Sequence, residues 1–324
     1  MSTSTPMLQH PLGPTGLMVT PVCLGCAPLG DMPKTFDYSV PEDRALETLR
    51  AAFTGPINFI DTAASYGDGE SERRIGIVLK ELGGVPKGVV LATKADRDLQ
   101  TGDFSGDQMR RSVERSLRLM GLEKLQLVYL HDPEHSTFEE ITAPGGALEV
   151  LVRLKEEGLI EHLGIAGGPI DMSVAYVETG AFEVAITHNR YTLVNRSAEP
   201  LLQATAERGL ALVNAAPYGS GMLAKGPDAY PRYAYQQAPP ELVEKVRKLA
   251  VICERHDFPL AAAALQFSIR DPRVHSTIVG MTRPERIAQT VELANTPIPD
   301  ELWSELEAVA DPQREDPEAR RWRQ

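Results

Sequence analysis

The sequence of 324 residues contains no long apolar run and no basic leader. A helix that spans a bilayer needs roughly 20 consecutive apolar residues, and no stretch approaches that length. The opening residues, MSTSTPMLQHPLG, lack the basic start and apolar middle of a signal peptide. We therefore expect a cytoplasmic protein rather than one that enters a membrane.

Positive charge is also scarce. The chain has 33 Lys and Arg against 45 Asp and Glu, which gives a formal net charge of -12 at pH 7. A surface of this sign repels nucleic-acid phosphates and anionic lipids, and the only basic cluster, RRWRQ at the end of the chain, is short. We expect neither a nucleic-acid partner nor a membrane partner. The sequence leaves the oligomeric state open.

Cysteine is rare, with only Cys23, Cys26 and Cys253 present. An odd number in a long chain favours reduced thiols over a disulfide framework. Cys23 and Cys26 form a C-x-x-C pattern, but no second Cys or His pair stands at the spacing that zinc ligands need. We interpret both as small apolar residues of a first strand, and we predict no metal site.

What the sequence does contain is a regular alternation of apolar strands and amphipathic helices. A hairpin over residues 10–26 leads into a first strand near residues 19–25. Seven further strands are expected at residues 57–61, 89–93, 125–130, 162–166, 183–187, 210–215 and 276–279. Helical patterns cover residues 41–53, 71–82, 105–120, 145–157, 170–179, 198–208, 241–255, 260–269 and 284–294.

This alternation requires parallel strands joined by right-handed crossovers, and eight such units close naturally into a barrel. We predict one domain over residues 1–324, a (β/α)8 barrel of the TIM type with an N-terminal hairpin. An open, doubly wound sheet is the alternative. Residues 299–310 add one C-terminal helix, and residues 1–8 and 311–324 are expected to be loose tails.

Four different polar side chains stand at or just beyond the ends of predicted strands. Asp61 ends INFID and Tyr66 follows five residues later, Lys94 ends VVLATK, and His131 ends LQLVYLH. Singly, each could be a cap, a packed ring or a solvated charge. Because the carboxyl ends of parallel strands meet at one face of a barrel, we expect the four to share one pocket.

Together these residues suit proton transfer at a C–O group. A phenol titrates at about 10, and a neighbouring ammonium is expected to lower that pKa. Asp61 would keep Lys94 charged, and His131 could hydrogen-bond the substrate oxygen, which makes Tyr66 a tuned proton donor or acceptor. None of these side chains carries a hydride, so a nicotinamide cofactor must supply one.

The segments DTAASYG, VLATK and LVYLHDP resemble the signature blocks of the aldo-keto reductases. The units SLRLMGLEKLQLVYLH and RLKEEGLIEHLGIAGG also resemble that family's, in the same order, so the resemblance spans residues 10–310. It implies that Tyr66 donates or accepts the proton, that Lys94 and Asp61 tune it, and that His131 orients the substrate oxygen. It also implies the barrel fold, with NAD(P) bound in extended form and not on a Rossmann motif.

The segments ITHNRYTLVNR, NAAPYGSGML and STIVGMTRPERIAQTVE are similar to the sugar-oxidising branch, the L-galactose, L-fucose and D-threo-aldose 1-dehydrogenases. That similarity implies oxidation of the anomeric carbon of a free aldose to a lactone. The alternatives are a reductase of small aldehydes or ketones, or a pyridoxal 4-dehydrogenase. A regulatory nicotinamide-binding module is disfavoured by the complete Asp-Tyr-Lys-His set, and a metal-dependent hydrolase by the lone strand-end histidine.

The resemblance further implies a set of cofactor-binding residues: Gly25, Ala166, His188, Asn189, Pro217, Tyr218, Gly219, Ser220, Gly221, Leu223, Gly280, Thr282, Arg283, Arg286 and Gln289. Glycines in the 218–223 loop allow backbone amides to approach a pyrophosphate closely. Many family members hold the nicotinamide carboxamide with Ser-Asn, and here Ala166-Gly167 stands instead. We expect His188 or Asn189 to take over, and Ala216 replaces a stacking tyrosine.

The choice between NAD and NADP leans slightly to NAD. Relatives that favour NADP carry a Lys-Ser pair where this chain has Gly280-Met281, which removes one charge for a 2′-phosphate. Arg283 or Arg286 could still pair with that phosphate.

For the substrate pocket we expect residues 32–38, His135, Tyr191 and residues 230–235. The only tryptophans are Trp303 and Trp322, late in the chain. The aromatic wall of steroid-reducing relatives is therefore missing, which favours a small polar substrate, sugar-like or carbonyl.

Overall fold

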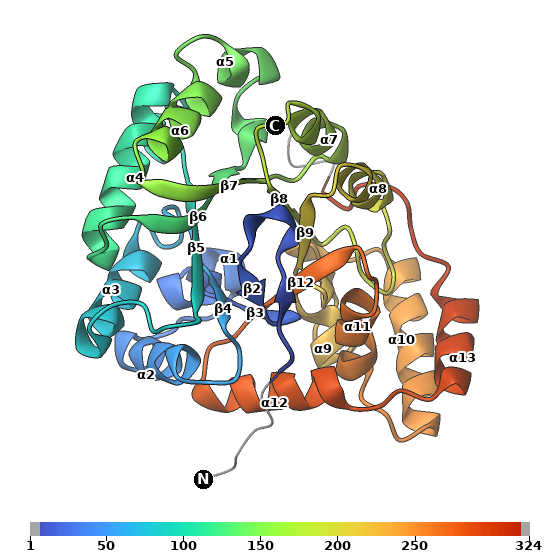
Figure 1. Cartoon of the computed structure of the whole chain (residues 1–324). Helices are drawn as coiled ribbons and strands as arrows, with labels where there is room; N and C mark the ends of the chain where they lie inside the picture. The colour runs from blue at the N-terminus through green and yellow to red at the C-terminus, as the bar shows by residue number, and fades with distance from the viewer. Residues whose placement is uncertain (1–6, 319–324) are drawn as a thin grey trace.

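The computed structural model describes residues 7–318, and a closed barrel of parallel strands forms its centre (Figure 1). In barrel order the strands are β12 (Val274–Gly280), β3 (Val22–Gly25), β4 (Phe59–Asp61), β5 (Val90–Ala95), β6 (Leu125–His131), β7 (Ile160–Ala166), β8 (Val184–His188) and β9 (Ala211–Ala215). Pairing of β12 with both β9 and β3 closes the ring. The predicted (β/α)8 barrel is confirmed, and the open-sheet alternative is wrong.

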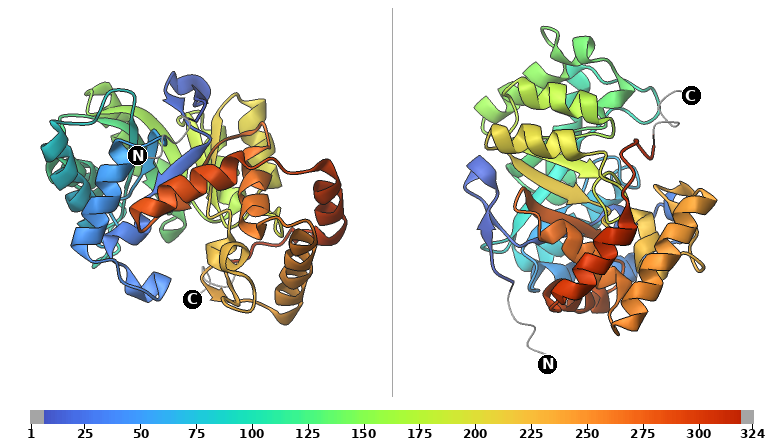
Figure 2. Two further views of the ribbon diagram at one scale, coloured as in Figure 1. Left: turned by 90° about the horizontal axis from the view of Figure 1, so that it is seen from below. Right: turned by 90° about the vertical axis from the view of Figure 1, so that its right-hand side faces the viewer.

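Helices surround the barrel and cover the outer face of the strands (Figure 2). They are α2 (Glu42–Phe53), α3 (Glu70–Leu82), α4 (Gly106–Met120), α6 (Ala147–Glu156), α7 (Ile170–Glu178), α8 (Glu199–Glu207), α11 (Leu260–Ile269) and α12 (Pro284–Asn295). Helix α4 begins where the sequence indicates, because the Ser105 side chain accepts a hydrogen bond from the Gln108 N–H. Helices α10 (Pro240–Arg255) and α13 (Asp300–Ala310) pack against each other outside this ring.

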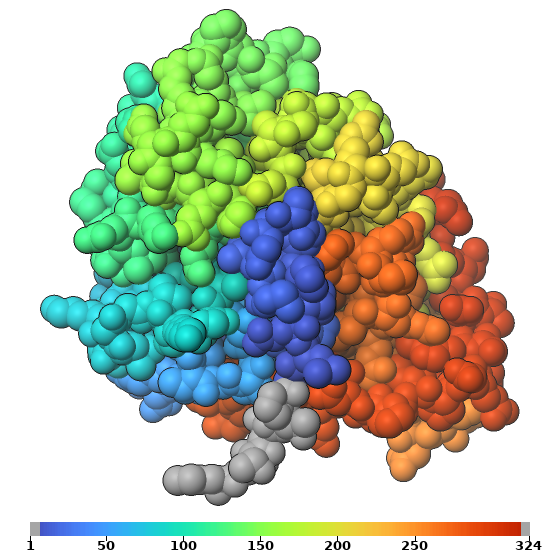
Figure 3. Space-filling view, in the orientation of Figure 1, coloured from blue at the N-terminus to red at the C-terminus, as the bar shows by residue number. Residues whose placement is uncertain are grey.

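A hairpin of β1 (His10–Pro11) and β2 (Met18–Val19) lies across the amino-terminal end of the barrel, as Figure 3 shows in blue. Leu12 and Val19 from this hairpin pack with Phe59 and Leu127 inside the barrel. At Gly13, an added Cβ would lie 2.6 Å from the backbone nitrogen of Ala211, so the hairpin sits directly on the strands. This end is closed, which leaves the carboxyl ends of the strands for a ligand site.

Several short elements interrupt the loops and were not expected from the sequence. They are α1 (Pro33–Phe36), α5 (Phe138–Thr142), α9 (Met222–Lys225) and the two-residue strands β10 (Arg232–Tyr233) and β11 (Gln236–Gln237). Segments of two to five residues are too short to show a periodic pattern. All three cysteines are buried and free, Cys23 inside the barrel and the other two in the larger apolar core around it. Along residues 7–318, no helix combines the length and apolarity that crossing a membrane demands.

The segment after α13 is not a loose tail, and that expectation is wrong for residues 311–318. It returns to the loop after β8 and makes backbone hydrogen bonds with it. The Gln313 N–H donates to the Val194 carbonyl at 2.9 Å, and the Arg196 N–H donates to the Gln313 carbonyl at 2.8 Å. Residues 1–6 and the basic cluster at 320–324 lie outside the described residues.

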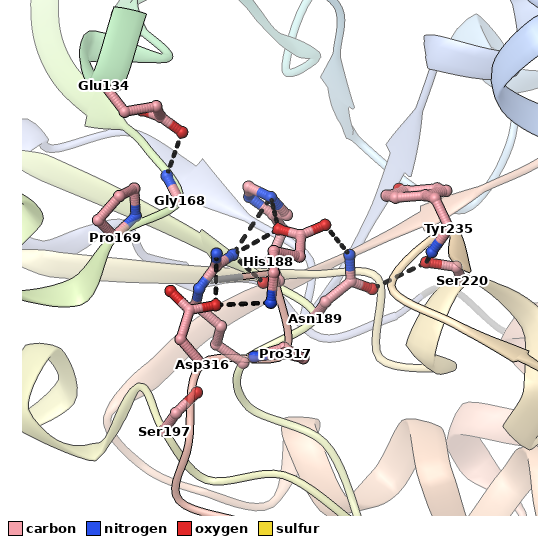
Figure 4. A network of polar contacts seen from close by, with 12 residues as sticks. Glu134, Gly168, Pro169, His188, Asn189, Ser197, Ser220, Tyr235, Asp316 and Pro317 are labelled. Atoms are coloured by element: carbon pink, nitrogen blue, oxygen red, sulfur yellow. Dashed lines mark hydrogen bonds and ion pairs between the residues drawn. The ribbon is translucent and has the colours of Figure 1, made fainter. Parts of the chain in front are cut away.

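Two carboxylates of this segment neutralise a cation that is wholly buried. Arg190, at 0% exposure, forms ion pairs with Asp316 at 2.8 Å and with Glu318 at 2.8 Å. Glu318 is itself 1% exposed and also accepts from His188 Nε2 at 3.0 Å, within the network of Figure 4. A buried guanidinium without partners would be costly, so Arg190 is the physical reason for the order of residues 316–318.

We predict that Glu318→Gln lowers the free energy of unfolding by about 1–3 kcal/mol, because one partner of the buried Arg190 loses its charge. Burial alone would raise the pKa of Glu318, but His188 and Arg190 outweigh it and lower the pKa to about 2. The stabilisation by ionised Glu318 is fully present above pH 4.5, the ordinary pKa of a glutamate, and is lost as the pH falls through about 2.

Urea unfolding at pH 7 measures the loss, with the exposed Glu307→Gln on α13 as the matched control. The difference in the free energy of unfolding between wild type and Glu318→Gln should shrink as the pH falls from 4.5 towards 2. If Glu318→Gln were as stable as Glu307→Gln, the ion pair with Arg190 would not be what orders residues 316–318.

Candidate active site

A cavity of about 710 Å³ opens at the carboxyl ends of the barrel strands. Asp61, Tyr66, Lys94 and His131 all line it. Asp61 ends β4, Lys94 lies near the end of β5 and His131 ends β6, so three adjacent strands deliver three of the side chains. The structure therefore brings together the four residues that the sequence selected.

The Lys94 ammonium joins this group by three hydrogen bonds. Its Nζ donates to Asp61 Oδ1 at 2.6 Å, to the Thr62 carbonyl at 2.8 Å and to Tyr66 Oη at 3.0 Å. An ammonium has three donors, and all three are used. Because the Tyr66 oxygen accepts from Lys94, the phenol proton is free to point towards another acceptor.

The pKa of Tyr66 differs from the expectation. Burial raises the pKa of the Tyr66 phenol well above its usual range, and the pull of Lys94 reduces this rise without reversing it. Burial would lower the pKa of Lys94, but Asp61 and Tyr66 outweigh it and raise that pKa, so the ammonium stays charged. The expectation of a net lowered Tyr66 pKa is wrong because it weighed the neighbouring charge without the loss of solvent.

His131 has a carboxylate partner that the sequence reading missed. Its Nδ1 lies 2.7 Å from Asp96 Oδ1, and Asp96 is buried. Its ring meets the Tyr66 ring edge to face, with centroids 5.9 Å apart and planes at 84°. Asp96 stands only two residues after Lys94, in VLATKAD, so an acidic residue close behind a strand-end lysine was the available signal.

Most of the expected cofactor residues line the same cavity: Gly25, Ala166, His188, Pro217, Tyr218, Ser220, Gly221, Gly280, Thr282, Arg286 and Gln289. Four do not. Leu223 is part of the apolar core, and Gly219 packs against the Tyr233 ring, where an added Cβ would lie 2.2 Å away. Arg283 is exposed at the start of α12, and Asn189 is wholly buried behind the cavity wall.

Asn189 instead supports the glycine-rich loop after β9. Ser220 Oγ donates to Asn189 Oδ1 at 3.1 Å and accepts from the Tyr235 N–H at 3.2 Å (Figure 4). These bonds hold the Ser220 backbone at φ 66°, between Gly219 at φ 56° and Gly221 at φ 131°. The Gly219 and Gly221 N–H groups donate to the carbonyls of Ala216 and Tyr218, at 3.0 Å each, so the loop is also braced by its own backbone.

The cavity fits an extended nicotinamide dinucleotide. Tyr66 and His131 line this cavity. Arg286 and Gln289 of α12 line it too, and the Arg286 guanidinium is suited to bind a phosphate. The glycine-rich loop also lines the cavity, and at Gly221 an added Cβ would approach the Tyr230 ring to 3.2 Å. Across residues 7–318, no group of three or more His, Cys, Asp or Glu is placed to hold a metal ion.

Aromatic and cationic side chains form the remaining wall. Tyr38, Tyr230 and Tyr235 line the cavity, and Lys225 Nζ lies 4.2 Å from the centre of the Tyr230 ring. Tyr191, expected in the substrate pocket, points elsewhere, because its hydroxyl donates to Asp271 at 2.5 Å and its ring packs on Phe267. His135, also expected there, is not among the lining residues.

Comparison with known proteins agrees with this geometry. The model of the aldo/keto reductase family matches residues 21–311. A D-threo-aldose 1-dehydrogenase from Pseudomonas sp is 32% identical, over 90% of this chain and 94% of that protein. An L-galactose dehydrogenase from Arabidopsis thaliana is 30% identical, over 93% of each chain. A pyridoxal 4-dehydrogenase from Microbacterium luteolum is 30% identical, over 92% of this chain and 96% of that one.

The fold is similar to that of an aldo-keto reductase from Bacillus halodurans, solved in its holo form. The two share 23% identity and a TM-score of 0.78, over 97% of this chain and 99% of the other. The family match and the relatives at 30% identity or more cover nearly the whole barrel. The chain therefore belongs to the aldo/keto reductase family, whose members are oxidoreductase enzymes that use nicotinamide cofactors.

Proposed function

We propose that this enzyme oxidises the anomeric carbon of a free aldose to a lactone and reduces NAD(P). The hydrogen bond from Lys94 Nζ to Tyr66 Oη, at 3.0 Å inside the cavity, carries the proposal. The names of the relatives support the substrate class, since one is named a 1-dehydrogenase of D-threo-aldoses, one a dehydrogenase of L-galactose and one a 4-dehydrogenase of pyridoxal.

In this proposal Tyr66 is the catalytic acid or base. Bound nicotinamide supplies the acceptor for the hydride, and Tyr66 takes the hydroxyl proton from the same carbon's oxygen. Lys94 favours the phenolate that must form, and Asp61 fixes Lys94 at 2.6 Å. Because burial raises the pKa of Tyr66, the phenolate is a strong base once formed.

His131 completes the site as the residue that orients the substrate oxygen. It lines the cavity beside Tyr66, with its ring edge against the phenol ring. Tyr66, in the loop after β4, and His131, at the end of β6, would therefore hold one oxygen for proton transfer.

The same proton relay runs in reverse, which keeps a second function open. With reduced cofactor, protonated Tyr66 would donate to the oxygen of a small aldehyde or ketone. The neutral phenol that burial favours is the form this reduction needs. Oxidation of pyridoxal in its hemiacetal form uses the same chemistry, and the Microbacterium relative supports it.

A panel of substrates separates these functions. We expect the purified enzyme to reduce NAD or NADP with L-fucose, L-galactose or D-arabinose, and hydroxylamine trapping to detect a lactone. Fast reduction of small aldehydes, with no turnover of any sugar, would reject the dehydrogenase proposal. Turnover of pyridoxal alone would indicate a pyridoxal dehydrogenase.

We predict that Tyr66→Phe lowers kcat by about 10²- to 10⁴-fold, the usual contribution of a general acid or base. The ring still fills its place, so NADH binding measured by fluorescence should change little. Tyr38→Phe is the matched control, because it removes a hydroxyl from the same cavity wall and leaves the Lys94 contact intact. Full activity of Tyr66→Phe would refute the role of the phenol.

For the cofactor we propose a preference for NAD, with residual use of NADP through Arg286. Gly280 and Arg286 both line the cavity, and the exposed Arg283 does not. We predict that Arg286→Ala raises the KM for NADP about tenfold and the KM for NAD less, since the lost pair is with the 2′-phosphate.

Arg283→Ala is the matched control and should leave both constants nearly unchanged. An equal rise of both KM values in Arg286→Ala would show instead that Arg286 serves a phosphate common to the two cofactors.

A further inference from the structure

Asp96 is tied to His131 by a short, buried contact that the mechanism above does not use. Its Oδ1 lies 2.7 Å from His131 Nδ1, and the two side chains are 3% and 10% exposed. No other described acceptor is as near to Nδ1, since Ser65 Oγ lies 3.5 Å away. The imidazole is therefore held chiefly by this one carboxylate.

Asp96 is fixed from several sides, so it cannot turn away from the ring. Its Oδ2 accepts from the Ser65 N–H at 2.8 Å. Its own N–H donates to Ser112 Oγ at 3.0 Å, and its carbonyl accepts from Gln108 Nε2 at 3.0 Å. The loop after β4 thus holds the carboxylate, and helix α4, which carries Gln108 and Ser112, holds the backbone of Asp96.

This geometry determines which ring nitrogen carries the proton. An ionised carboxylate only accepts hydrogen bonds, so His131 Nδ1 must be the donor in the pair. In neutral imidazole the other nitrogen, Nε2, then has a lone pair and no proton. The cavity, which His131 lines, would meet an acceptor at neutral imidazole and a donor at imidazolium.

The charges around His131 come from every element that packs against it. Lys94 lies on β5 and Asp96 directly follows that strand, Asp132 directly follows β6 with Oδ1 3.4 Å from Nε2, and Asp61 ends β4. Burial lowers the pKa of His131, but Asp132 and Asp96 outweigh both burial and Lys94, so the pKa is raised. The pKa of Asp96 is correspondingly lowered, because His131 and the Ser65 N–H outweigh its burial.

We propose that Asp96 is a positioning residue that fixes the tautomer of His131: Nδ1 keeps its proton towards Asp96, and Nε2 is the nitrogen that gains a proton when the ring is charged and then donates a hydrogen bond to the substrate oxygen. His131 transfers no proton to substrate in this scheme, because Tyr66 does so. The inference deepens the proposed function and rests on it for the identity of the substrate groups.

The consequence is a dependence of activity on pH. Since the pKa of His131 is raised, the imidazolium persists to higher pH than in a free histidine, and below that pKa it donates from Nε2 to the substrate oxygen. The proton of a reacting hydroxyl is then left for Tyr66. Above that pKa the neutral ring has no proton at Nε2, so this hydrogen bond is lost.

The first experiment needs no substrate. The chain has 7 histidines, and NMR of the ¹⁵N-histidine-labelled enzyme, with His131→Asn to assign the signal, reports which nitrogen is protonated. We expect the Nδ1–H tautomer at high pH in the wild type. In Asp96→Asn we expect a lower pKa for His131 and a larger share of the Nε2–H tautomer. A wild-type ring protonated at Nε2 would overturn the proposal without any variant.

Asp132→Asn is the matched control, because it removes the other carboxylate beside His131 and leaves Nδ1 paired with Asp96. In Asp132→Asn, His131 should keep the tautomer that it has in the wild type. If Asp132→Asn changes the tautomer and Asp96→Asn does not, the assignment to Asp96 is wrong.

The second experiment measures kcat/KM against pH in both directions. We expect Asp96→Asn to lose about 10- to 100-fold in kcat/KM in both directions, the usual effect of losing a hydrogen bond to a charged group, and we expect its activity to fall at a lower pH than that of the wild type. Asp96→Glu should restore part of this loss. An equal loss at every pH, with the shape of the pH profile unchanged, would indicate a merely structural role.

The two experiments also separate this inference from the proposed function. If no sugar is turned over but the NMR result is as expected, the substrate proposal fails and the role of Asp96 stands. If sugars are oxidised but the His131 tautomer is unaffected by Asp96→Asn, the role of Asp96 fails alone.

Discussion

The structure of the site depends on one buried cation, the Lys94 ammonium. Its three hydrogen bonds reach a carboxylate on β4, the Thr62 carbonyl beyond that strand, and the Tyr66 hydroxyl in the following loop. A charge so far from water is tolerated only where each of its donors has an acceptor in good geometry. The need of the ammonium for a third acceptor therefore fixes the position of Tyr66, a loop residue, relative to the barrel strands.

Much of the barrel could be predicted because its signals are local. Helix α11 begins at Leu260 and ends at Ile269, as the sequence pattern indicates, and LQLVYLH runs as strand β6 up to His131. Parallel strands put their ends on one face, so the meeting of Asp61, Lys94 and His131 followed from the fold alone. The roles given to these residues remain predictions until the variants are measured.

What the sequence could not predict depends on contacts between distant residues. The charged composition of residues 311–318 is typical of a solvated tail, and nothing near Arg190 indicates that this side chain is wholly buried and needs acids from 126 and 128 residues later. Tyr191 was misplaced for the same reason, since Asp271 holds its hydroxyl away from the cavity. The pKa of Tyr66 depends on desolvation, which no sequence pattern reports.

The ion pair between Arg190 and Glu318 also bears on when the enzyme becomes competent. Glu318 lines the cavity and follows Gly280, where the last barrel strand ends, by 38 residues, so it is synthesised after all the barrel strands. The barrel strands end at Gly280 and can pair earlier, while Arg190 still lacks its carboxylates. A nascent chain whose synthesis has passed Gly280 and not yet reached Glu318 would thus carry the barrel strands and a pocket that lacks one carboxylate of its wall.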